Sequence, residues 1–287
     1  MGLFLFLRET LRTASLLTAK SFYSLNLPLL LLAVLLSVPA YFFQILSWNM
    51  IMRYLGVSLS MRQSIQGYPL TFLARYIPGS IWGYWSRSEW LRESCNISYV
   101  TSLSASVLEV VLFLLAAASI TIFGVSFQLS GLMRTTARLT TGILIILTGL
   151  GIPWISHRMG GCLPQAAYNN NKYWYQAVVF AGVPLCLHGG TLFLISKAIW
   201  TTSSLDSMGA VYATSLSWLL GFVLIFIPAG IGVRETALSY LLIKYFGFPT
   251  GLASLAAVTF RFVQVLTEAE WLLLGLLLTS WHPRKET

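Results

Sequence analysis

The stretch Phe226-Ile227-Pro228-Ala229-Gly230-Ile231-Gly232-Val233-Arg234-Glu235 interrupts an apolar part of the chain with a proline, two glycines and two charges. The apolar runs beside it, Leu216–Ile227 and Thr236–Phe246, are too short to cross a bilayer, which requires about 20 apolar residues in a helix. Proline and glycine separate the two runs. The pattern therefore predicts a re-entrant hairpin, in which two half-helices meet at a non-helical tip. Because irregular backbone inside a membrane must be buried in protein or line a wet cavity, this tip is a candidate site.

A second stretch repeats this arrangement earlier in the chain. Tyr76-Ile77-Pro78-Gly79 matches Phe226-Ile227-Pro228-Ala229, and Ser98-Tyr99-Val100-Thr101-Ser102-Leu103 matches Thr250-Gly251-Leu252-Ala253-Ser254-Leu255. Ser86-Arg87-Ser88-Glu89 has the form of a helix capping box, as does Gly232-Val233-Arg234-Glu235 with glycine at the cap. The offsets are 228 − 78 = 150, 235 − 89 = 146 and 250 − 98 = 152. These matches predict an internal repeat.

The composition is that of a polytopic all-α membrane protein. Of the 287 residues, 56% are hydrophobic and 9% charged, whereas a soluble domain carries roughly 25% charged residues. The net charge of +9 comes from basic residues scattered at segment ends, where they meet anionic lipid headgroups, and it does not indicate a nucleic-acid partner. The three cysteines and three histidines show no metal spacing, and no nucleotide or hydrolase motif occurs. We therefore expect no metal, no cofactor and no enzymatic activity.

The chain divides into predicted segments along its length. Residues 1–26 are expected to form an interfacial helix, 27–280 a single transmembrane domain with halves of about 27–135 and 136–280, and 281–287 a tail. The hairpins cover roughly Gln63–Glu93 and Val211–Phe246. The predicted full spans are Leu27–Leu46, Ser98–Phe123, Leu139–Ile155, Trp174–Ile195 and Leu252–Leu278. Three of them lie between the hairpins, and this odd number predicts an inverted repeat with its site near the midplane.

The predicted half-helix N-termini supply the candidate headgroup site. A helix N-terminus presents unpaired backbone N–H groups and a positive dipole end, which suit a phosphate. Arg87 and Arg234 lie in the first turns, and Gly79, Gly230 and Gly232 bring the backbone close to a ligand. Glu89 and Glu235 share these turns as expected helix caps. The alternative is that the two arginines only pair with these two glutamates.

The full spans after the hairpins supply candidate groove residues. Ser98, Ser102, Ser106 and Glu109 share one helical face. Arg261 follows Thr250 by 11 residues, as Glu109 follows Ser98, so the repeat predicts that Glu109 and Arg261 approach each other across the groove. The alternative is local pairing, of Glu109 with Ser102 or Ser106 and of Arg261 with Glu268. The remaining predicted groove residues are Glu235, Glu89, Arg75 and Trp82, although Trp82 also suits an interfacial belt.

The residues of both hairpins resemble a known family. Pro228–Glu235 is similar to the "P-x-G-x-G-x-R-E" signature of the lysylphosphatidylglycerol synthase transmembrane, or flippase-like, family. Tyr76–Trp82 with Arg87 resembles the first-half motif of that family, and Glu109 fits the glutamate of the next helix. The resemblance covers roughly Leu27–Leu278. It implies a membrane unit that, in the best-known members, moves an aminoacylated phospholipid made by an attached soluble aminoacyltransferase. We expect a stand-alone member without that enzyme domain.

These features together predict translocation of an anionic lipid, either a phospholipid or a polyprenyl-phosphate-linked molecule, across the cell membrane. Without an ATP site, transport would be downhill or ion-coupled. One alternative is a membrane scaffold for a separately encoded lipid-modifying enzyme or glycosyltransferase, and another is a membrane transferase with Glu109 as its base. The sequence is compatible with a homo-oligomer or with a partner enzyme.

Overall fold

The computed structural model describes residues 25–74, 82–127, 129–151, 171–223 and 228–280. Every regular element in these ranges is a helix, which confirms the predicted all-α class. Four helices are long and apolar enough to cross a membrane: α3 (Leu27–Tyr54), α7 (Tyr99–Ser126), α10 (Asn171–Ile199) and α13 (Thr250–Ser280). The chain is thus a multi-pass membrane protein.

The other helices are shorter. They are α4 (Met61–Gly67), α5 (Leu70–Ala74), α6 (Trp82–Cys95), α8 (Gly131–Ile146), α11 (Ser207–Val223) and α12 (Val233–Phe246). A π-helical turn (Leu147–Gly151) continues α8, and a 3₁₀ turn (Pro228–Gly230) precedes α12. The 17 residues of α11 and the 14 of α12 fall short of a bilayer core, as the sequence predicts. Re-entry of the hairpins into the membrane stays a prediction.

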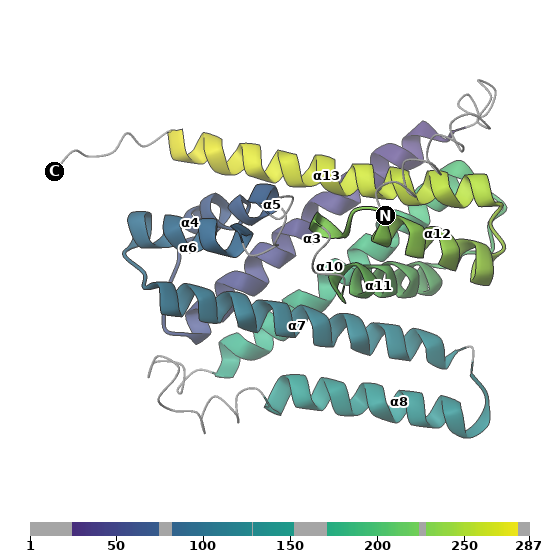
Figure 1. The fold of residues 1–287 in the computed structure, drawn as a ribbon, viewed down its shortest axis with the longest axis horizontal. Coiled ribbons are helices and arrows are strands. Elements are labelled where there is room, and N and C mark those ends of the chain that lie inside the picture. Colours follow the sequence, from purple (N-terminus) through teal and green to yellow (C-terminus); the bar gives the residue numbers. More distant parts are fainter. Residues whose placement is uncertain (1–24, 75–81, 128, 152–170, 224–227, 281–287) are drawn as a thin grey trace.

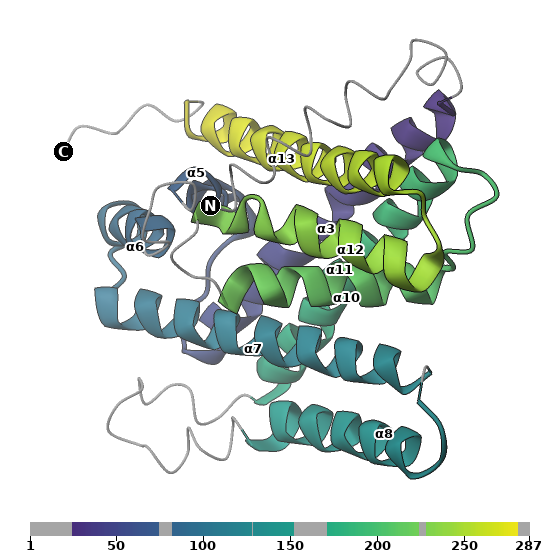
Figure 2. The ribbon, with the colours of Figure 1, turned by 45° about the vertical axis from the view of Figure 1, so that its right-hand side comes forward.

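Most of the helices pack side by side in one row, and two long helices, α3 and α10, cross this row. In the row, α13 packs on α12, α12 on α11, α11 on α7 and α7 on α8 (Figure 2). Helices α3 and α10 pack against each other and run diagonally across the bundle (Figure 1). The group α4–α6 lies at the end of the bundle where α7 begins, whereas α12 turns into α13 at the opposite end (Figure 1).

Apolar side chains cover the outside of the bundle. On α8 and its π-helical turn, the side chains of Leu139, Ile143 and Leu150 are all more than half exposed, whereas the threonines Thr141 and Thr148 are buried. A helix of a water-soluble protein would instead bury its apolar side chains and expose its polar ones. This outside-apolar pattern is expected where lipid replaces water as the solvent.

Two apolar clusters hold the bundle, and both include α3 and α10. The first joins the C-terminal half of α3, including Trp48, to α4–α7 and to the start of α10 at Trp174. The second joins Ala33 near the start of α3 and Leu192 near the end of α10 to α11–α13. The middle parts of α3 and α10 therefore lie between the two clusters, where they can line a cavity.

Equivalent hydroxyl pairs link each short helix to the span that follows it. Ser88 of α6 lies 2.8 Å from Ser102 of α7, and Ser239 of α12 lies 3.1 Å from Ser254 of α13. The offsets, 239 − 88 = 151 and 254 − 102 = 152, match those of the proline and threonine positions in the sequence. The internal repeat itself stays a prediction, and these two contacts favour it.

The two predicted capping boxes have different outcomes. Glu235 accepts a hydrogen bond from the Gly232 N–H at 2.7 Å, so this cap is confirmed. The box at Ser86 is wrong, because α6 is already helical at Trp82 and the Ser86 hydroxyl donates to the Gly83 carbonyl within the helix. Arg75, Pro78 and Gly79, the proposed interfacial helix up to residue 24 and the tail 281–287 lie outside the described residues.

Candidate functional site

A cavity of about 320 Å³ lies between the two apolar clusters. Its walls come from α3, α5, α6, α7, α10, α11, α12, α13 and the 3₁₀ turn before α12, so both halves of the chain contribute. The charged and polar side chains that line it are Tyr41, Gln44, Tyr68, Thr71, Tyr84, Arg87, Glu109, His188, Arg234, Arg261, Gln264 and Glu268. Such a concentration of polar groups inside an apolar bundle is costly in a membrane, and it makes the cavity the candidate functional site.

On the first-half side, the cavity wall carries a buried ion pair. Arg87 of α6 is fully buried, and its Nη2 lies 2.8 Å from Oε2 of Glu109 on α7. The same nitrogen donates to the Ser106 hydroxyl at 2.7 Å, and the Tyr68 hydroxyl donates to Oε1 of Glu109 at 2.6 Å. Both oxygens of the Glu109 carboxylate are therefore engaged, and the pair ties α6 to α7.

Aromatic rings cover the Arg87 guanidinium. Its central carbon lies 4.7 Å from the Trp48 ring centre, 5.2 Å from that of Tyr68 and 5.7 Å from that of Tyr84. Within the described part of the chain, Nε and Nη1 of Arg87 have no hydrogen-bond acceptor, and the three rings lie within cation–π distance of the guanidinium. Arg87 thus belongs to the wall of the cavity, and its charge is already balanced by Glu109 instead of being directed at a ligand.

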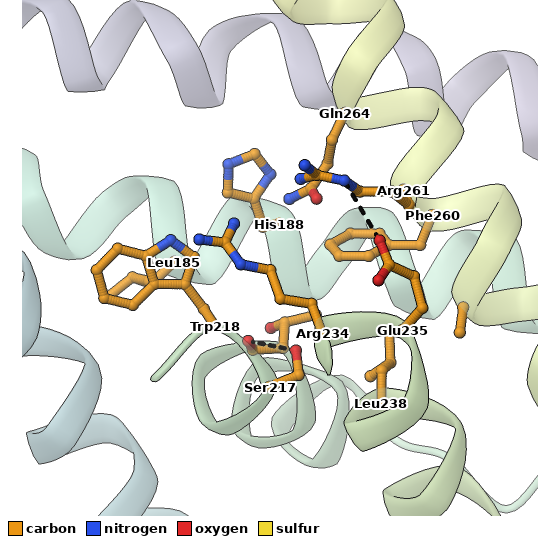
Figure 3. Close-up of a pocket in the computed structure, with 12 residues that line it drawn as sticks. Leu185, His188, Ser217, Trp218, Arg234, Glu235, Leu238, Phe260, Arg261 and Gln264 are labelled. Atoms are coloured by element: carbon orange, nitrogen blue, oxygen red, sulfur yellow. Dashed lines mark hydrogen bonds and ion pairs between the residues drawn. The ribbon is translucent and has the colours of Figure 1, made fainter. Parts of the chain in front are cut away.

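On the second-half side, the charges are arranged differently (Figure 3). Oε1 of Glu235 on α12 lies 3.4 Å from Nε of Arg261 on α13, while Oε2 holds the Gly232 amide. Arg261 also reaches the Ala229 carbonyl at 3.5 Å. Arg234 extends from α12 into the cavity, and its guanidinium carbon lies 5.7 Å from the centre of the Trp218 ring.

The backbone before α12 adopts left-handed conformations that shape this side. Ala229, Gly230 and Gly232 have φ of 52°, 65° and 83°. A Cβ at Gly230 would lie 2.9 Å from Nε of Arg234, and a Cβ at Gly221 on α11 would lie 2.3 Å from its Cγ. The two glycines therefore form the slot through which Arg234 reaches the cavity.

The structure brings some predicted residues together and leaves others apart. Glu109, Arg234, Arg261 and Gly230 line the one cavity. The predicted pairing of Glu109 with Arg261 is wrong, since each residue forms its ion pair within its own half.

The remaining predicted site residues make other contacts, are exposed, or lie outside the described residues. Glu89 accepts a hydrogen bond from the Tyr99 hydroxyl and does not form the predicted cap, and Arg87 pairs with Glu109 instead of with Glu89 as in the alternative. Trp82 is 54% exposed, in keeping with its alternative as an interfacial residue. The Gly232 amide is engaged by Glu235, and Arg75 and Gly79 lie outside the described residues.

Several cavity residues escape prediction from the sequence. Tyr41 of α3 donates to Oε1 of Glu268 on α13 at 2.8 Å, and Gln44 lies 3.5 Å from Nε2 of His188. Each of Tyr41, Gln44 and His188 is a single polar residue in an apolar run, a pattern that fits a packed side chain equally well. The only available signal is that all three lie inside a predicted span, His188 near the middle of its span and Tyr41 and Gln44 in the C-terminal part of theirs. Among the described residues, no cluster of three metal-ligating side chains occurs.

The comparisons with known proteins agree with this architecture. No curated protein matches the chain. A family model described as the lysylphosphatidylglycerol synthase TM region matches residues 3–268, which include both hairpin motifs and every cavity residue named above. The chain therefore belongs to the lysylphosphatidylglycerol synthase transmembrane family.

Proposed function

We propose that this protein translocates an anionic lipid across the cell membrane without an enzymatic activity of its own. The observation that carries the proposal is the charged cavity between the two halves, with three arginines and two glutamates in its walls. The family is lipid-related, which supports a lipid as the transported molecule. A phospholipid and a polyprenyl-phosphate-linked lipid share the phosphate that Arg234 and Arg261 would recognise.

The size of the cavity suits a lipid headgroup. A volume of about 320 Å³ corresponds to roughly ten water molecules at about 30 Å³ each, which is enough for a phosphate and a small polar substituent. The acyl chains would stay in the surrounding bilayer. Polar walls lower the cost of moving the headgroup through the apolar layer, where an isolated charge costs several kcal/mol.

The proposed energy source is based on the motifs in the sequence. Its sequence holds no nucleotide-binding motif, so we propose movement down a lipid gradient or coupled to an ion. The competing role as a scaffold for a separate enzyme would require packing surfaces, and it would give no reason for a polar cavity in the middle of the bundle. The cavity therefore favours transport.

Reconstitution into vesicles tests the proposal. Proteoliposomes would contain phosphatidylglycerol with a fluorescent group on one acyl chain, and dithionite would quench the label in the outer leaflet. The wild-type protein should make nearly all of the label accessible, whereas protein-free vesicles should stop at about half. Arg234→Gln should reduce the rate at least about tenfold, as expected for the loss of a charged hydrogen-bonding contact.

The matched control is Arg138→Gln, which removes one positive charge from an exposed position on α8. It should transport at the wild-type rate. The transport proposal is overturned if folded and correctly inserted wild-type protein moves neither labelled phosphatidylglycerol nor a labelled polyprenyl phosphate.

A further inference from the structure

One wall of the cavity, between α7 and α11, consists of apolar side chains. Val110 and Phe113 of α7 and Trp218 and Phe222 of α11 line the cavity on this side. The centres of the Phe113 and Trp218 rings are 6.4 Å apart, and those of Trp218 and Phe222 are 5.5 Å apart in a stacked arrangement. Helices α7 and α11 pack against each other, so these rings fill the space between them.

This wall is thin. Val111 follows Val110 and Val223 follows Phe222, and these two valines are 36% and 73% exposed without lining the cavity. Helix α8 packs on the side of α7 away from α11, so it does not lie over the wall (Figure 2). A single layer of apolar side chains therefore separates the cavity from the outside of the bundle at this place.

Other helix pairs around the cavity are joined more firmly. The first-half ion pair ties α6 to α7, and the hydrogen bond from Tyr41 to Glu268 ties α3 to α13. Helices α10 and α11 approach so closely at Gly189 that an added Cβ would lie 2.3 Å from Val211. Between these helices, an acyl chain would have to break a buried polar contact or separate two closely packed backbones.

The α7–α11 wall has one closed end and one end filled by rings. Near the C-terminus of α7, an added Cβ at Gly124 would lie 2.7 Å from the Tyr212 ring, so the two helices are in close contact there. Further toward the middle of α7, Phe113 and Phe222 occupy the space. A phenylalanine ring has no polar atom, so it can turn to another rotamer without losing a hydrogen bond.

Trp218 connects this wall to the charged part of the cavity. The guanidinium carbon of Arg234 lies 5.7 Å from the centre of the Trp218 ring, and Figure 3 shows the two side chains next to each other. The headgroup and the acyl chains of a phospholipid are separated by only a glycerol unit. A lipid whose phosphate contacts Arg234 would therefore have its chains close to the α7–α11 wall.

We infer that the wall formed by Val110, Phe113, Trp218 and Phe222 is a portal through which the acyl chains of the transported lipid project into the bilayer. The inference rests on the proposed function, because the occupant is a lipid whose headgroup lies in the cavity. Projection of the chains through the portal keeps their apolar surface out of the polar part of the cavity.

Transport by paired variants tests the portal in the dithionite assay described above. Val110→Trp and Phe222→Trp add bulk inside the wall, and each should slow the movement of labelled phosphatidylglycerol at least about fivefold. The matched controls are Val111→Trp and Val223→Trp, which place the same ring one residue further along, on the outside of the bundle. Both controls should transport at the wild-type rate.

A photoreactive lipid gives a second readout that does not depend on transport. Phosphatidylglycerol with a diazirine in one acyl chain would be added to nanodiscs that hold the full chain, and mass spectrometry would locate the label after illumination. Phe113 is only 8% exposed, so it should be labelled only if a chain enters the portal. Ile143 on α8 is 56% exposed and reports the surrounding lipid. Val110→Trp should lose the label at Phe113 and keep it at Ile143.

The two readouts keep the test decisive. If Val110→Trp fails to fold, as judged by its thermal midpoint, then Phe222→Trp and the labelling of the wild-type protein still decide. Wild-type transport rates in both folded portal variants would overturn the portal. Labelling confined to outward-facing residues such as Val111 and Ile143 would overturn it as well.

The portal and the proposed function can fail separately. If the wild-type protein moves lipid and the folded portal variants move it equally fast, the portal is wrong and transport stands. If the wild-type protein moves no lipid, while Phe113 is labelled and Val110→Trp removes that label, the portal stands as a site for acyl chains and transport is wrong.

Discussion

At the scale of single residues, the predicted repeat places charges of opposite sign at matching positions in the two halves. Glu109 and Arg261 occupy equivalent positions, since 261 − 109 = 152 is the register of the Ser102–Ser254 match. Their partners are Arg87 on α6 and Glu235 on α12. In this register Arg87 corresponds to Ser239 (87 + 152 = 239), so Glu235 lies four residues, about one helical turn, earlier than an exact repeat would place it. The sequence therefore predicts where the charges lie but not which of them pair, because one turn of shift changes the partner.

A double-mutant cycle tests the first-half ion pair. Removing one member of a buried pair leaves the other charge uncompensated and costs roughly 3–5 kcal/mol. Arg87→Gln and Glu109→Gln should each lower the free energy of unfolding by about that amount. The double variant should cost clearly less than the sum, with a coupling of at least about 1 kcal/mol measured by denaturant unfolding in detergent.

The matched comparison is the cycle between Glu109 and Arg261, which line the same cavity without forming an ion pair. This cycle should be additive to within about 0.5 kcal/mol. Strong coupling there, with none between Arg87 and Glu109, would contradict the assignment of partners.

At the scale of elements, the turn before α12 shows which features local sequence patterns predict and which they do not. Proline followed by two glycines predicts a break between two half-helices, and the structure has a 3₁₀ turn with left-handed residues at that place. The cap by Glu235 also follows from its spacing to Gly232. The same reasoning fails at Ser86, because a local capping pattern cannot reveal that the helix has already begun at Trp82. The role of Gly221 was not predictable, since its contact with Arg234 joins two separate helices.

Gly221→Ala tests the slot that holds Arg234. The added Cβ would lie 2.3 Å from Cγ of Arg234, so either the arginine or helix α11 must move. Overpacking of this kind costs about 1–3 kcal/mol. We expect a lower thermal midpoint and at least about fivefold weaker binding of dioctanoylphosphatidylglycerol.

The control for this prediction is Gly182→Ala on α10, where an added Cβ meets no atom within 4 Å. It should bind normally and be as stable as the wild-type protein or slightly more so, since alanine favours a helix over glycine. Equal behaviour of the two variants would show that the slot does not position Arg234.

At the scale of the whole molecule, composition and segment length predict most of the architecture. The low charge content predicts a membrane protein, and the apolar runs predict the four long helices to within a few residues at most ends. The cavity could not be predicted in the same way. Tyr41 and Glu268 are separated by 227 residues, and they meet because α3 and α13 cross between two apolar clusters. Such a contact depends on how complete helices pack.

The predicted inverted arrangement of the two halves has a consequence for sidedness. Three helical segments, α7, α8 with its π-helical turn, and α10, separate the α6–α7 connection from the hairpin α11–α12. The α6–α7 and α12–α13 connections lie at opposite ends of the bundle (Figure 1). If the membrane normal runs along these helices, Glu93 near the first connection and Thr250 at the second face opposite sides of the membrane.

Single cysteines at Glu93 and Thr250, which are both exposed, test this arrangement in a variant whose three native cysteines are replaced by serine. In sealed vesicles with uniform protein orientation, a membrane-impermeant maleimide should label one of the two positions from outside. The other should react only after the vesicles are opened with detergent, because a charged reagent cannot cross the apolar layer. The opened sample also serves as the control that both thiols are reactive. Labelling of both positions from the same face would contradict the inverted repeat, and the two hairpins could then not approach the cavity from opposite leaflets.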